Sequence, residues 1–506
     1  MFLFLLSSLV FVKEAATTLT AKPNIVIVVA DDLGYTDVGF NGGDQIPTPN
    51  IDWLAKRGVI LSNYYTAKIC TPSRGSLLTG RHQMQLGLQR SVILPSAPYG
   101  LGLNETLLPQ YLKKYGYSTH MVGKWHLGYY KLDYTPTRRG FDTHFGVWNG
   151  KSDYFSHYDT DWGVHSNESG LDLWDNLRVA SEYNGSYITQ LYGQKAVEII
   201  KNHNQSNPFF LYLAHQAVHN GISPQPLKAP QEYLDKFSFI THDGRRRYAA
   251  MLSVLDDTIG NLTSALISSG MYENTLLIFT TDNGGPVDGF SMNYASNWPL
   301  RGCKETYWEG GVRGAAFLHG KMLKNPGRTS HQLMHISDWL PTLMTVIGEK
   351  LPTDIDYYGV DQWAAIQYDV ASPRKEIIHS YDLSTGAIRH GDYKLVICCD
   401  NNMNGWYPEQ KYVPTNQNPY ISCGERNSSL PACTKDKPCL FDIQSDPCEY
   451  NNIASLKPQL SKWLLEKLET FADAAQPPRN KPSDPAAFPR FHNGHWTNWL
   501  DKNPIY

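Results

Sequence analysis

The sequence predicts an α/β fold in which helices pack on a sheet of buried strands and a smaller antiparallel-sheet subdomain follows. Three runs of β-branched and other apolar residues, 24–30, 209–214 and 275–281, are typical of strands buried on both faces. After residue 371 the runs shorten and six cysteines crowd together, which favours a separate unit. We therefore expect a main domain over 17–371 and a subdomain over 372–506.

Helical and extended patterns alternate along the chain. Residues 50–58 carry an apolar helical face and the run 59–64 is extended, which indicates a βαβ unit. Residues 247–270 have apolar side chains at spacings of three and four, typical of a long helix packed on a sheet, and their acidic pair Asp256 and Asp257 is expected to face solvent. Further helices are expected at 107–115, 336–342 and 460–471, and further strands at 118–122 and 393–397.

Composition and charge restrict the possible functions. The 506 residues are 41% hydrophobic, enough to bury a large core, and the formal net charge is only −3. The basic run 245–247 is short and is interpreted as a solvated helix start. The sequence therefore predicts no nucleic-acid partner.

The N-terminus carries a targeting pattern. The apolar run 2–12 is too short to span a bilayer and precedes small residues at 15–16, so residues 1–16 are interpreted as a signal peptide. No Lys or Arg precedes the run, and a membrane-anchored start is the alternative. We expect a protein of the secretory pathway, lysosomal or extracellular, without stable membrane insertion.

Glycosylation sequons fit that compartment, although each one alone is a weak signal. The predicted acceptors are Asn104, Asn167, Asn184, Asn204, Asn261 and Asn427.

The eight cysteines are unevenly placed. Cys70 and Cys303 stand alone, and Cys303 is expected to be a free buried thiol. The other six, which an oxidising compartment would allow to pair in fifteen ways, are Cys398, Cys399, Cys423, Cys433, Cys439 and Cys448. A zinc site is disfavoured because the cluster contains no histidine and no Cys-x-x-Cys.

Oxygen ligands follow two of the buried strands. Asp31 and Asp32 come directly after 24–30, and Asp282 and Asn283 come directly after 275–281. Open α/β sheets bind ligands at the carboxyl ends of their strands, and such oxygens suit Ca²⁺ or Mg²⁺. An ordinary Asp-Asp-Gly turn is the alternative for the first pair.

Basic side chains form a second group of candidates. Cys70 is placed at a helix start with Arg74 one turn on, an arrangement that suits an anionic site. Lys124 and His126 are two apart on an extended segment, so both could reach one anion. His215 and His219 follow the strand 209–214; Lys304 precedes a glycine-rich loop.

The strings C-T-P-S-R-G-S-L-L-T-G-R at 70–81, G-K-W-H-L-G at 123–128 and W-E-G-G-V-R-G at 308–314 resemble those of the type I sulfatases. The resemblance implies an alkaline-phosphatase-like fold with a large mixed sheet. It also implies that Cys70 is oxidised to Cα-formylglycine by a formylglycine-generating enzyme. One Ca²⁺ would be bound by an oxygen of residue 70 together with Asp31, Asp32, Asp282 and Asn283.

The resemblance also assigns roles in catalysis. Lys124 and Lys304 would bind the sulfate, and Asp282 would accept a proton from the formylglycine hydrate. His219, matched by its position after the strand, or Lys304 would protonate the departing alcohol. Arg74 would hold the hydrate, and His126 would remove its second proton so that sulfate leaves.

Within the family the chain is most similar to arylsulfatase B, the N-acetylgalactosamine-4-sulfatase, which implies aryl sulfates and glycosaminoglycans as substrates. A sulfatase of small sulfated metabolites such as glucosinolates would keep the same centre. Three further hypotheses stay open: a phosphatase or phosphonate hydrolase, a non-catalytic glycan-binding relative, and a cysteine hydrolase that uses the Cys70 thiolate.

Overall fold

The computed structural model describes residues 22–161, 168–289, 291–398, 403–407, 421–426 and 433–505. The expected signal peptide at 1–16, the sequons at Asn167 and Asn427, and Cys399 lie outside these ranges.

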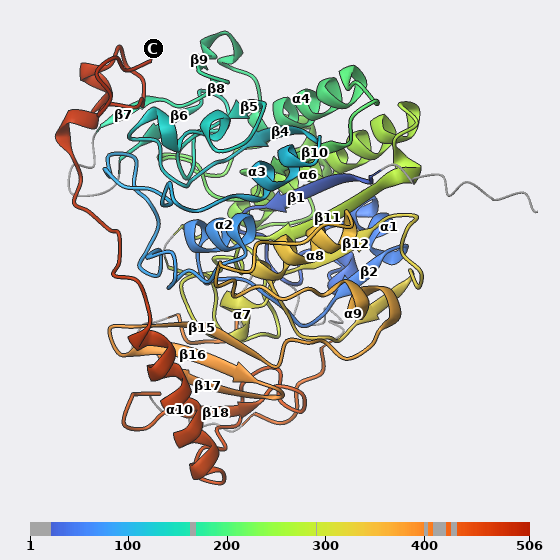
Figure 1. Ribbon diagram of the computed structural model, residues 1–506, viewed down its shortest axis with the longest axis vertical. Helices are drawn as coiled ribbons and strands as arrows, with labels where there is room; N and C mark the ends of the chain where they lie inside the picture. Colours follow the sequence, from blue (N-terminus) through green and yellow to red (C-terminus); the bar gives the residue numbers. More distant parts are fainter. Residues whose placement is uncertain are drawn as a thin grey trace, which may run out of the picture.

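A twisted mixed sheet forms the centre of the molecule (Figure 1). Strand β1 pairs in parallel with β10 and β11, β10 pairs in parallel with β4, and β12 runs antiparallel to β11. This confirms the expected mixed α/β sheet. In the described ranges its order is β13 (Arg328–Ser330), β2 (Val59–Leu61), β12 (Ala316–His319), β11 (Thr275–Thr281), β1 (Asn24–Ala30), β10 (Phe209–Ala214), β4 (Ser118–Gly123), β5 (Thr143–Gly146), β8 (Trp174–Asp175) and β9 (Arg178–Val179).

Helices cover both faces of this sheet. Alternate residues of β1 point to opposite faces, so Val26 and Val28 join one hydrophobic core while Ile25 and Ile27 join the other. The first core is shared with α1 (Pro49–Lys56), α4 (Ile188–Asn202), α5 (Gln231–Lys236) and α6 (Asp243–Ser268). The second is shared with α2 (Cys70–Thr79), α3 (Leu108–Lys114), α8 (Trp339–Val346) and α9 (Trp363–Tyr368).

Smaller elements complete this part of the chain. Helix α7 (Glu309–Val312) lies between β11 and β12 in sequence. The run expected as one strand at 59–64 is divided, because β2 ends at Leu61 and Tyr64 belongs to a separate pair. The two short strand pairs are β3 (Tyr64–Tyr65) with β14 (Met334–His335), and β6 (Tyr158–Thr160) with β7 (Ser169–Leu171).

Two expectations about charged residues on α6 were wrong for one residue each, since Arg246, Arg247 and Asp257 are partly exposed. Arg245 is fully buried and forms an ion pair with Asp37 (2.7 Å), so the basic run is not solvated throughout. Asp256 is also buried, and it accepts hydrogen bonds from the backbone N–H groups of Asn50 (3.1 Å) and Ile51 (2.8 Å). These N–H groups begin α1 and lack intrahelical acceptors, which explains why an acid is buried there.

The subdomain is an antiparallel sheet covered by one helix, as expected. In the described ranges the sheet runs in the order β15 (Glu376–Asp382), β16 (Thr385–His390), β17 (Tyr393–Ile397) and β18 (Cys439–Asp442). Helix α10 (Pro458–Asp473) packs on β15 and β16 through Leu464 and Leu468.

The cysteine cluster forms two disulfides among the described residues, Cys423–Cys448 and Cys433–Cys439. The thiol of Cys398 lies 3.8 Å from Oδ1 of Asn404, and Cys399 lies outside the described residues, so the pairing of all six cysteines stays a prediction. Cys303 is a free buried thiol, as expected.

After α10 ends at Asp473, the chain leaves the subdomain and runs back along the main domain to β7 (Figure 1). The backbone N–H of Asp484 donates to the carbonyl of Ser96 (2.9 Å), and that of Leu500 donates to Tyr130 (3.0 Å). Trp496 packs in one cluster with Trp148 and Trp174. The C-terminal end therefore supports the segment that follows β5.

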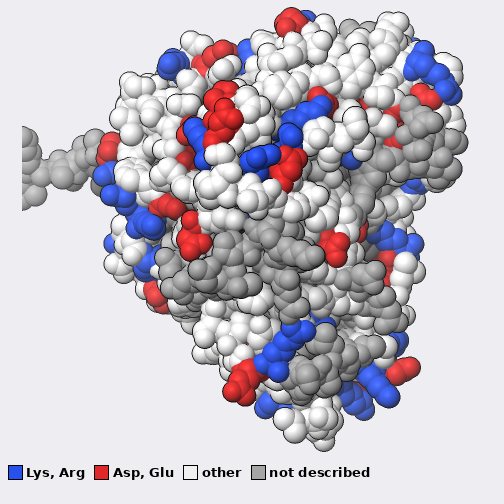
Figure 2. Space-filling model, turned by 180° about the vertical axis from the view of Figure 1, so that it is seen from behind, with Lys and Arg blue, Asp and Glu red and all other residues white. Residues whose placement is uncertain are grey.

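On the face drawn in Figure 2, Lys and Arg side chains lie next to Asp and Glu side chains. Within the described ranges, no helix has both the length and the apolar character needed to cross a bilayer.

Candidate active site

Three carboxylates and one amide meet at the carboxyl ends of β1 and β11. The two strands are parallel neighbours with Ala30 opposite Thr281, so the residues that follow them lie side by side. Asp31, Asp32, Asp282 and Asn283 are all fully buried. Asp32 has a positive φ of 58°, which turns the chain sharply at the strand end.

Three buried cations balance the three carboxylates. Arg74, from α2, donates through Nε to Asp282 (3.0 Å) and lies 3.4 Å from Asp31. Lys124, directly after β4, forms an ion pair with Asp31, and Lys304 contacts Asp32 at 2.8 Å.

The surroundings shift the pKa values of Asp31 and Asp282 in opposite directions. Burial and Asp282 together raise the pKa of Asp31 to about 7, although Lys124 opposes them. Burial also works to raise the pKa of Asp282, but Arg74 and Lys124 outweigh it and the pKa is lowered. Asp282 therefore carries its negative charge most firmly.

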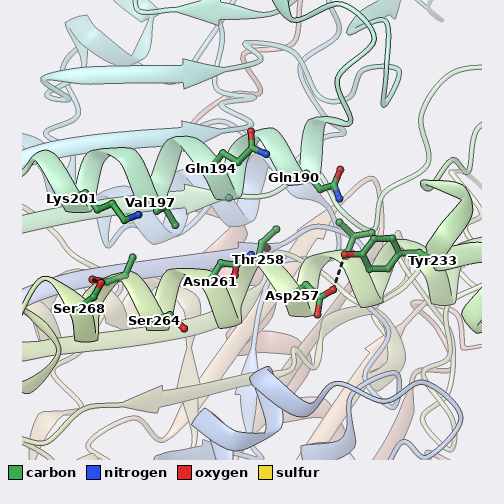
Figure 3. Close-up of a pocket in the computed structure, with 13 residues that line it drawn as sticks. Gln190, Gln194, Val197, Lys201, Tyr233, Asp257, Thr258, Asn261, Ser264 and Ser268 are labelled. Atoms are coloured by element: carbon green, nitrogen blue, oxygen red, sulfur yellow. Dashed lines mark hydrogen bonds between the residues drawn. The ribbon is translucent and has the colours of Figure 1, made fainter.

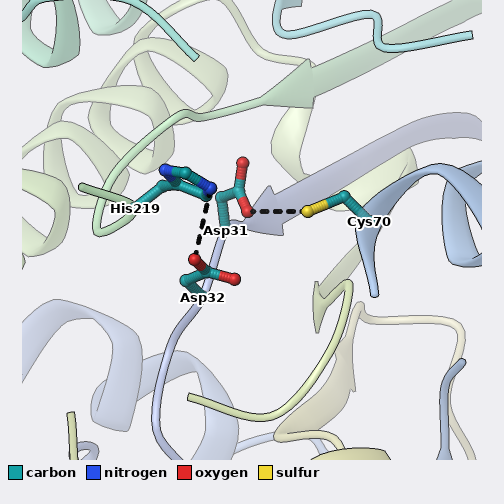
Figure 4. Close-up of side chains that lie close together, drawn as sticks. All are labelled: Asp31, Asp32, Cys70 and His219. Carbon is teal, nitrogen blue, oxygen red and sulfur yellow. Dashed lines mark hydrogen bonds and ion pairs between the residues drawn. The ribbon is translucent and has the colours of Figure 1, made fainter. Parts of the chain in front are cut away.

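Cys70 faces the carboxylates from the first residue of α2 (Figure 4). Its Sγ lies 3.7 Å from Oδ1 of Asp31, and the side chain is buried. Burial raises the pKa of the Cys70 thiol even though Lys124 and Lys304 lie nearby. The site therefore favours the protonated thiol, which argues against a thiolate nucleophile.

His219 belongs to the same cluster, but His215 does not. Nε2 of His219 lies 3.4 Å from Oδ2 of Asp32, and Nδ1 lies 2.5 Å from the carbonyl oxygen of Asn220. Ligand atoms of Asp31, Asp32, Cys70 and His219 all lie within 4.8 Å of one another.

The backbone that carries His126 is not extended, contrary to expectation. Strand β4 ends at Gly123 and His126 has a positive φ of 59°, so the argument from an extended Lys-x-His segment was wrong. Nε2 of His126 lies 3.1 Å from the carbonyl oxygen of Ile93, and the buried Nδ1 has no hydrogen-bond partner. Burial, reinforced by Lys124, lowers the pKa of His126 and keeps its imidazole neutral.

The donor set fits a hard divalent cation. Asn283 donates through Nδ2 to Asp32 (2.7 Å), and its buried Oδ1 has no hydrogen-bond partner. Carboxylate and amide oxygens gathered at one point are what Ca²⁺ or Mg²⁺ prefers. The orphaned amide oxygen is the observation that most directly supports a cation there.

Comparison with known proteins decides the family. A family model described as "Sulfatase" matches residues 23–349. The chain belongs to the sulfatase family. Arylsulfatase J of Mus musculus is 42% identical over 96% of this chain and 82% of its own, and arylsulfatase A of Homo sapiens is 32% identical over 92% of each. The solved structure of Ps i-CgsB in complex with k-i-k-neocarrahexaose superimposes with a TM-score of 0.73 at 27% identity, covering 90% of this chain and 94% of that one. The chain is therefore a sulfuric ester hydrolase.

Sequence reasoning missed several residues that shape the site of this sulfatase. Oγ1 of Thr71 donates to the carbonyl of His126 (3.0 Å) and accepts from the N–H of Ile93 (3.3 Å), which ties α2 to the histidine loop. A Cβ on Gly150 would lie 2.4 Å from Cε1 of His126, so only glycine fits against that ring. The next residue, Lys151, lies within electrostatic range of Lys124. Thr71 lies inside the C-T-P-S-R string but was given no role there, and no motif marked Gly150 or Lys151.

A separate groove lies between α4 and α6 (Figure 3). Polar and apolar side chains line it together, and they include Tyr233, whose hydroxyl donates to Asp257 (2.7 Å). None of the sulfatase site residues lines it, but the sequon residue Asn261 does.

Proposed function

We propose that this sulfatase hydrolyses sulfate monoesters through a Cα-formylglycine formed from Cys70, with one Ca²⁺ bound beside it. The observation that carries the proposal is the position of Cys70: a protonated, buried thiol directed at the carboxylates rather than at a base that could activate it. An aldehyde hydrate at this position would place hydroxyl groups where the structure has Sγ. The C-T-P-S-R string supports the same conversion.

Ca²⁺ would be held by Asp31, Asp32, Asp282 and Asn283 together with an oxygen of residue 70. When bound, the ion supplies positive charge that stabilises negative oxygens of the substrate.

The chain's own residues can perform the proton transfers. Asp282, held ionised by Arg74, would accept a proton from one hydroxyl of the residue 70 hydrate as that oxygen bonds to sulfur and the bond from sulfur to the alcohol oxygen breaks. The remaining sulfate oxygens would contact Lys124 and Lys304. His219 or Lys304 would donate a proton to the leaving oxygen, since both lie at Asp32.

His126 would complete the cycle. Its neutral imidazole has an unpartnered Nδ1 that could accept the second hydroxyl proton, after which the C–O bond to sulfate breaks and the aldehyde returns. Arg74 holds this region together because it binds Asp282 and also donates to the carbonyl of Lys124 (3.0 Å).

The substrate class that we favour is a sulfated glycan, with aryl sulfates accepted in vitro. Ps i-CgsB, similar over nine-tenths of this chain, was solved with an oligosaccharide bound. The relatives named above are arylsulfatases J and A, so the assignment to arylsulfatase B and its N-acetylgalactosamine 4-sulfate substrate stays a prediction. Small sulfated metabolites such as glucosinolates are the second candidate. A non-catalytic glycan-binding role is less favoured because every proposed site residue is present.

A secretory location accompanies the proposal, with a formylglycine-generating enzyme as the partner during biosynthesis. The four sequon residues in the described ranges, Asn104, Asn184, Asn204 and Asn261, are all exposed and accessible to glycosylation. Either a lysosomal or an extracellular destination is compatible with these features.

The test is mass spectrometry of the tryptic peptide that spans Ile69 to Arg74, combined with kinetics. We expect the active enzyme to lack sulfur at residue 70 and to carry an aldehyde there. Cys70→Ala should lower kcat/KM for an aryl sulfate by at least about a thousandfold, whereas Cys303→Ala, the matched buried thiol, should not. Active enzyme with an intact, alkylatable Cys70 would overturn the proposal.

A further inference from the structure

Lys151 is the basic side chain near the active site to which the proposed chemistry gives no role. It follows Gly150, which packs so closely against the imidazole of His126 that a Cβ would clash, so its backbone is fixed at the edge of the site. The side chain is half-buried.

Charges on two sides surround the Lys151 ammonium. Burial lowers the pKa of Lys151 and outweighs Asp159, which raises it. Lys304 and Lys124 lower it further, which places Lys151 within electrostatic range of both lysines proposed to bind sulfate. Lys151 therefore has Asp159 and the two lysines proposed to bind sulfate among its charged neighbours.

Asp159 is an anionic neighbour of Lys151. It is buried, its Oδ1 accepts from the backbone N–H of Thr160 (2.7 Å), and its Oδ2 has no hydrogen-bond partner. Burial is the largest influence on the pKa of Asp159 and raises it, while Lys151 is the strongest opposing charge. Asp159 thus stabilises a cation at Lys151 without belonging to the metal-binding group.

The backbone on the other side of Lys151 is held firmly. Ser152 and Gln216 exchange two hydrogen bonds, Oγ to Oε1 (3.0 Å) and Nε2 to the Ser152 carbonyl (2.7 Å). Asp153 pairs with Lys228, and the hydroxyl of Tyr154 donates to the carbonyl of His219 (2.7 Å). A rigid segment joined to both His126 and His219 therefore presents Lys151.

We propose that Lys151 binds a second anionic group of the substrate, a carboxylate or another sulfate next to the scissile sulfate, and so determines specificity. The inference rests on the proposed function. The scissile sulfate already has Lys124 and Lys304, and Asp31, Asp32 and Asp282 balance these lysines and Arg74. Lys151 adds a cation within electrostatic range of these lysines, on a segment packed against His126, and so fits a further negative charge on the substrate.

The test compares three substrates that share one ring: phenyl sulfate, 2-carboxyphenyl sulfate and benzene-1,2-bis(sulfate). In Lys151→Met we expect the ratio of kcat/KM for a dianion to kcat/KM for phenyl sulfate to fall about 10- to 100-fold, chiefly through KM. Lys151→Arg should retain most of the ratio because it retains the charge. Lys201→Met, which removes an exposed lysine of α4, should leave the ratio unchanged. A loss confined to the carboxylate or to the bis-sulfate would identify which anion is bound.

Other outcomes have separate meanings. An equal loss on all three substrates in Lys151→Met, or an unchanged ratio, would overturn the inference, because Lys151 would then serve the scissile sulfate, the loop or neither. A wild-type enzyme that is inactive on phenyl sulfate but active on phosphodiesters would instead defeat the proposed function itself.

Discussion

Two buried charge clusters in this sulfatase look alike in composition but differ in what their atoms leave unpaired. The first is the active-site cluster of Asp31, Asp32, Asp282, Arg74, Lys124 and Lys304. The second, which we term the interdomain cluster, consists of Glu309, Arg313, Lys394 and Glu449. Both bury several charges of each sign, and both include residues of the strings that resemble those of the family: Arg74 and Lys124 in the first, Glu309 and Arg313 in the second.

In the interdomain cluster each carboxylate is paired with a cation: Oε1 of Glu449 has no hydrogen-bond partner, but it lies 2.9 Å from Nζ of Lys394. Lys394 contacts Glu309 (2.8 Å) and Glu449 (2.9 Å), and the second oxygen of Glu309 accepts from Tyr65 (2.7 Å). Glu449 also accepts from the backbone N–H of Glu309 (2.8 Å), which fastens the subdomain to α7.

Next to the active-site cluster, by contrast, Asn283 lies beside Asp32 with a buried Oδ1 that has no hydrogen-bond partner, and ligand atoms of Asp31, Asp32, Cys70 and His219 lie within 4.8 Å of one another. Buried charge alone therefore does not indicate chemistry. The informative feature is a set of converging ligand atoms next to an oxygen that the protein does not itself satisfy.

The largest expected effect comes from neutralising one acid of the active-site cluster. Asp282→Asn should lower kcat/KM by at least about a thousandfold, because it removes both a proton acceptor and a charge opposite Arg74. Asp257→Asn, on the outer side of α6, is the matched control and should remain active. Full activity in Asp282→Asn would show that unsatisfied, converging oxygens do not distinguish a reactive cluster from a structural one.

In the interdomain cluster we expect the opposite result, a loss of stability with the activity retained. Lys394→Met leaves Glu309 and Glu449 buried without their shared cation, which should cost about 3–5 kcal/mol in the free energy of unfolding. The kcat of the folded fraction should stay within about twofold of wild type, because no substrate group lies there. Denaturant unfolding and active-site titration measure the two quantities. Lys462→Met, which removes an exposed lysine of α10, should change stability by less than about 0.5 kcal/mol.

The contrast also shows what the sequence could and could not predict. Strands β1, β10 and β11 were predicted within their observed bounds because continuous apolar runs leave little choice of structure, and the acids that follow β1 and β11 met as expected. Interactions between distant parts of the chain were not predictable, such as Lys394 and Glu449 closing on Glu309, or Asp256 capping α1. The same holds for Lys151, since only the folded chain brings it to Lys304 and Asp159.

A third prediction concerns His82, whose neutral imidazole is buried next to the subdomain, and the effect of its protonation on stability. The neutral ring uses both nitrogens: Nε2 lies 2.8 Å from the carbonyl oxygen of Ile378, and Nδ1 accepts from the backbone N–H of Met84 (3.2 Å). Burial lowers the pKa of His82 to about 4, and nearby Arg374 contributes. The unfolded chain therefore binds a proton at His82 more readily than the folded chain does.

The sign of the pH effect follows from that difference. The stability that neutral His82 provides is present above its unfolded pKa of about 6.5 and is lost as the pH falls towards 4, up to about 3 kcal/mol. His82→Gln should flatten the stability profile of the wild type by that amount over this interval in urea unfolding. An unchanged slope would contradict the prediction. His390, the partly exposed histidine at the end of β16, supplies a control through His390→Gln.

The smallest expected effect is a Ca²⁺-dependent gain in stability, which distinguishes the two clusters without an activity assay. If the orphaned Asn283 oxygen marks a cation site, Ca²⁺ at a hundredfold excess over its dissociation constant should raise the free energy of unfolding by about 2.7 kcal/mol, and a chelator should reverse the gain. Lys394→Met should show the same Ca²⁺-dependent shift from a lower starting stability, because its defect lies elsewhere. Asp282→Asn should show a much smaller shift, because it removes an anionic ligand. A shift of equal size in Asp282→Asn would place the cation outside the active-site cluster, and Zn²⁺ in place of Ca²⁺ in elemental analysis would reject the oxygen-ligand argument.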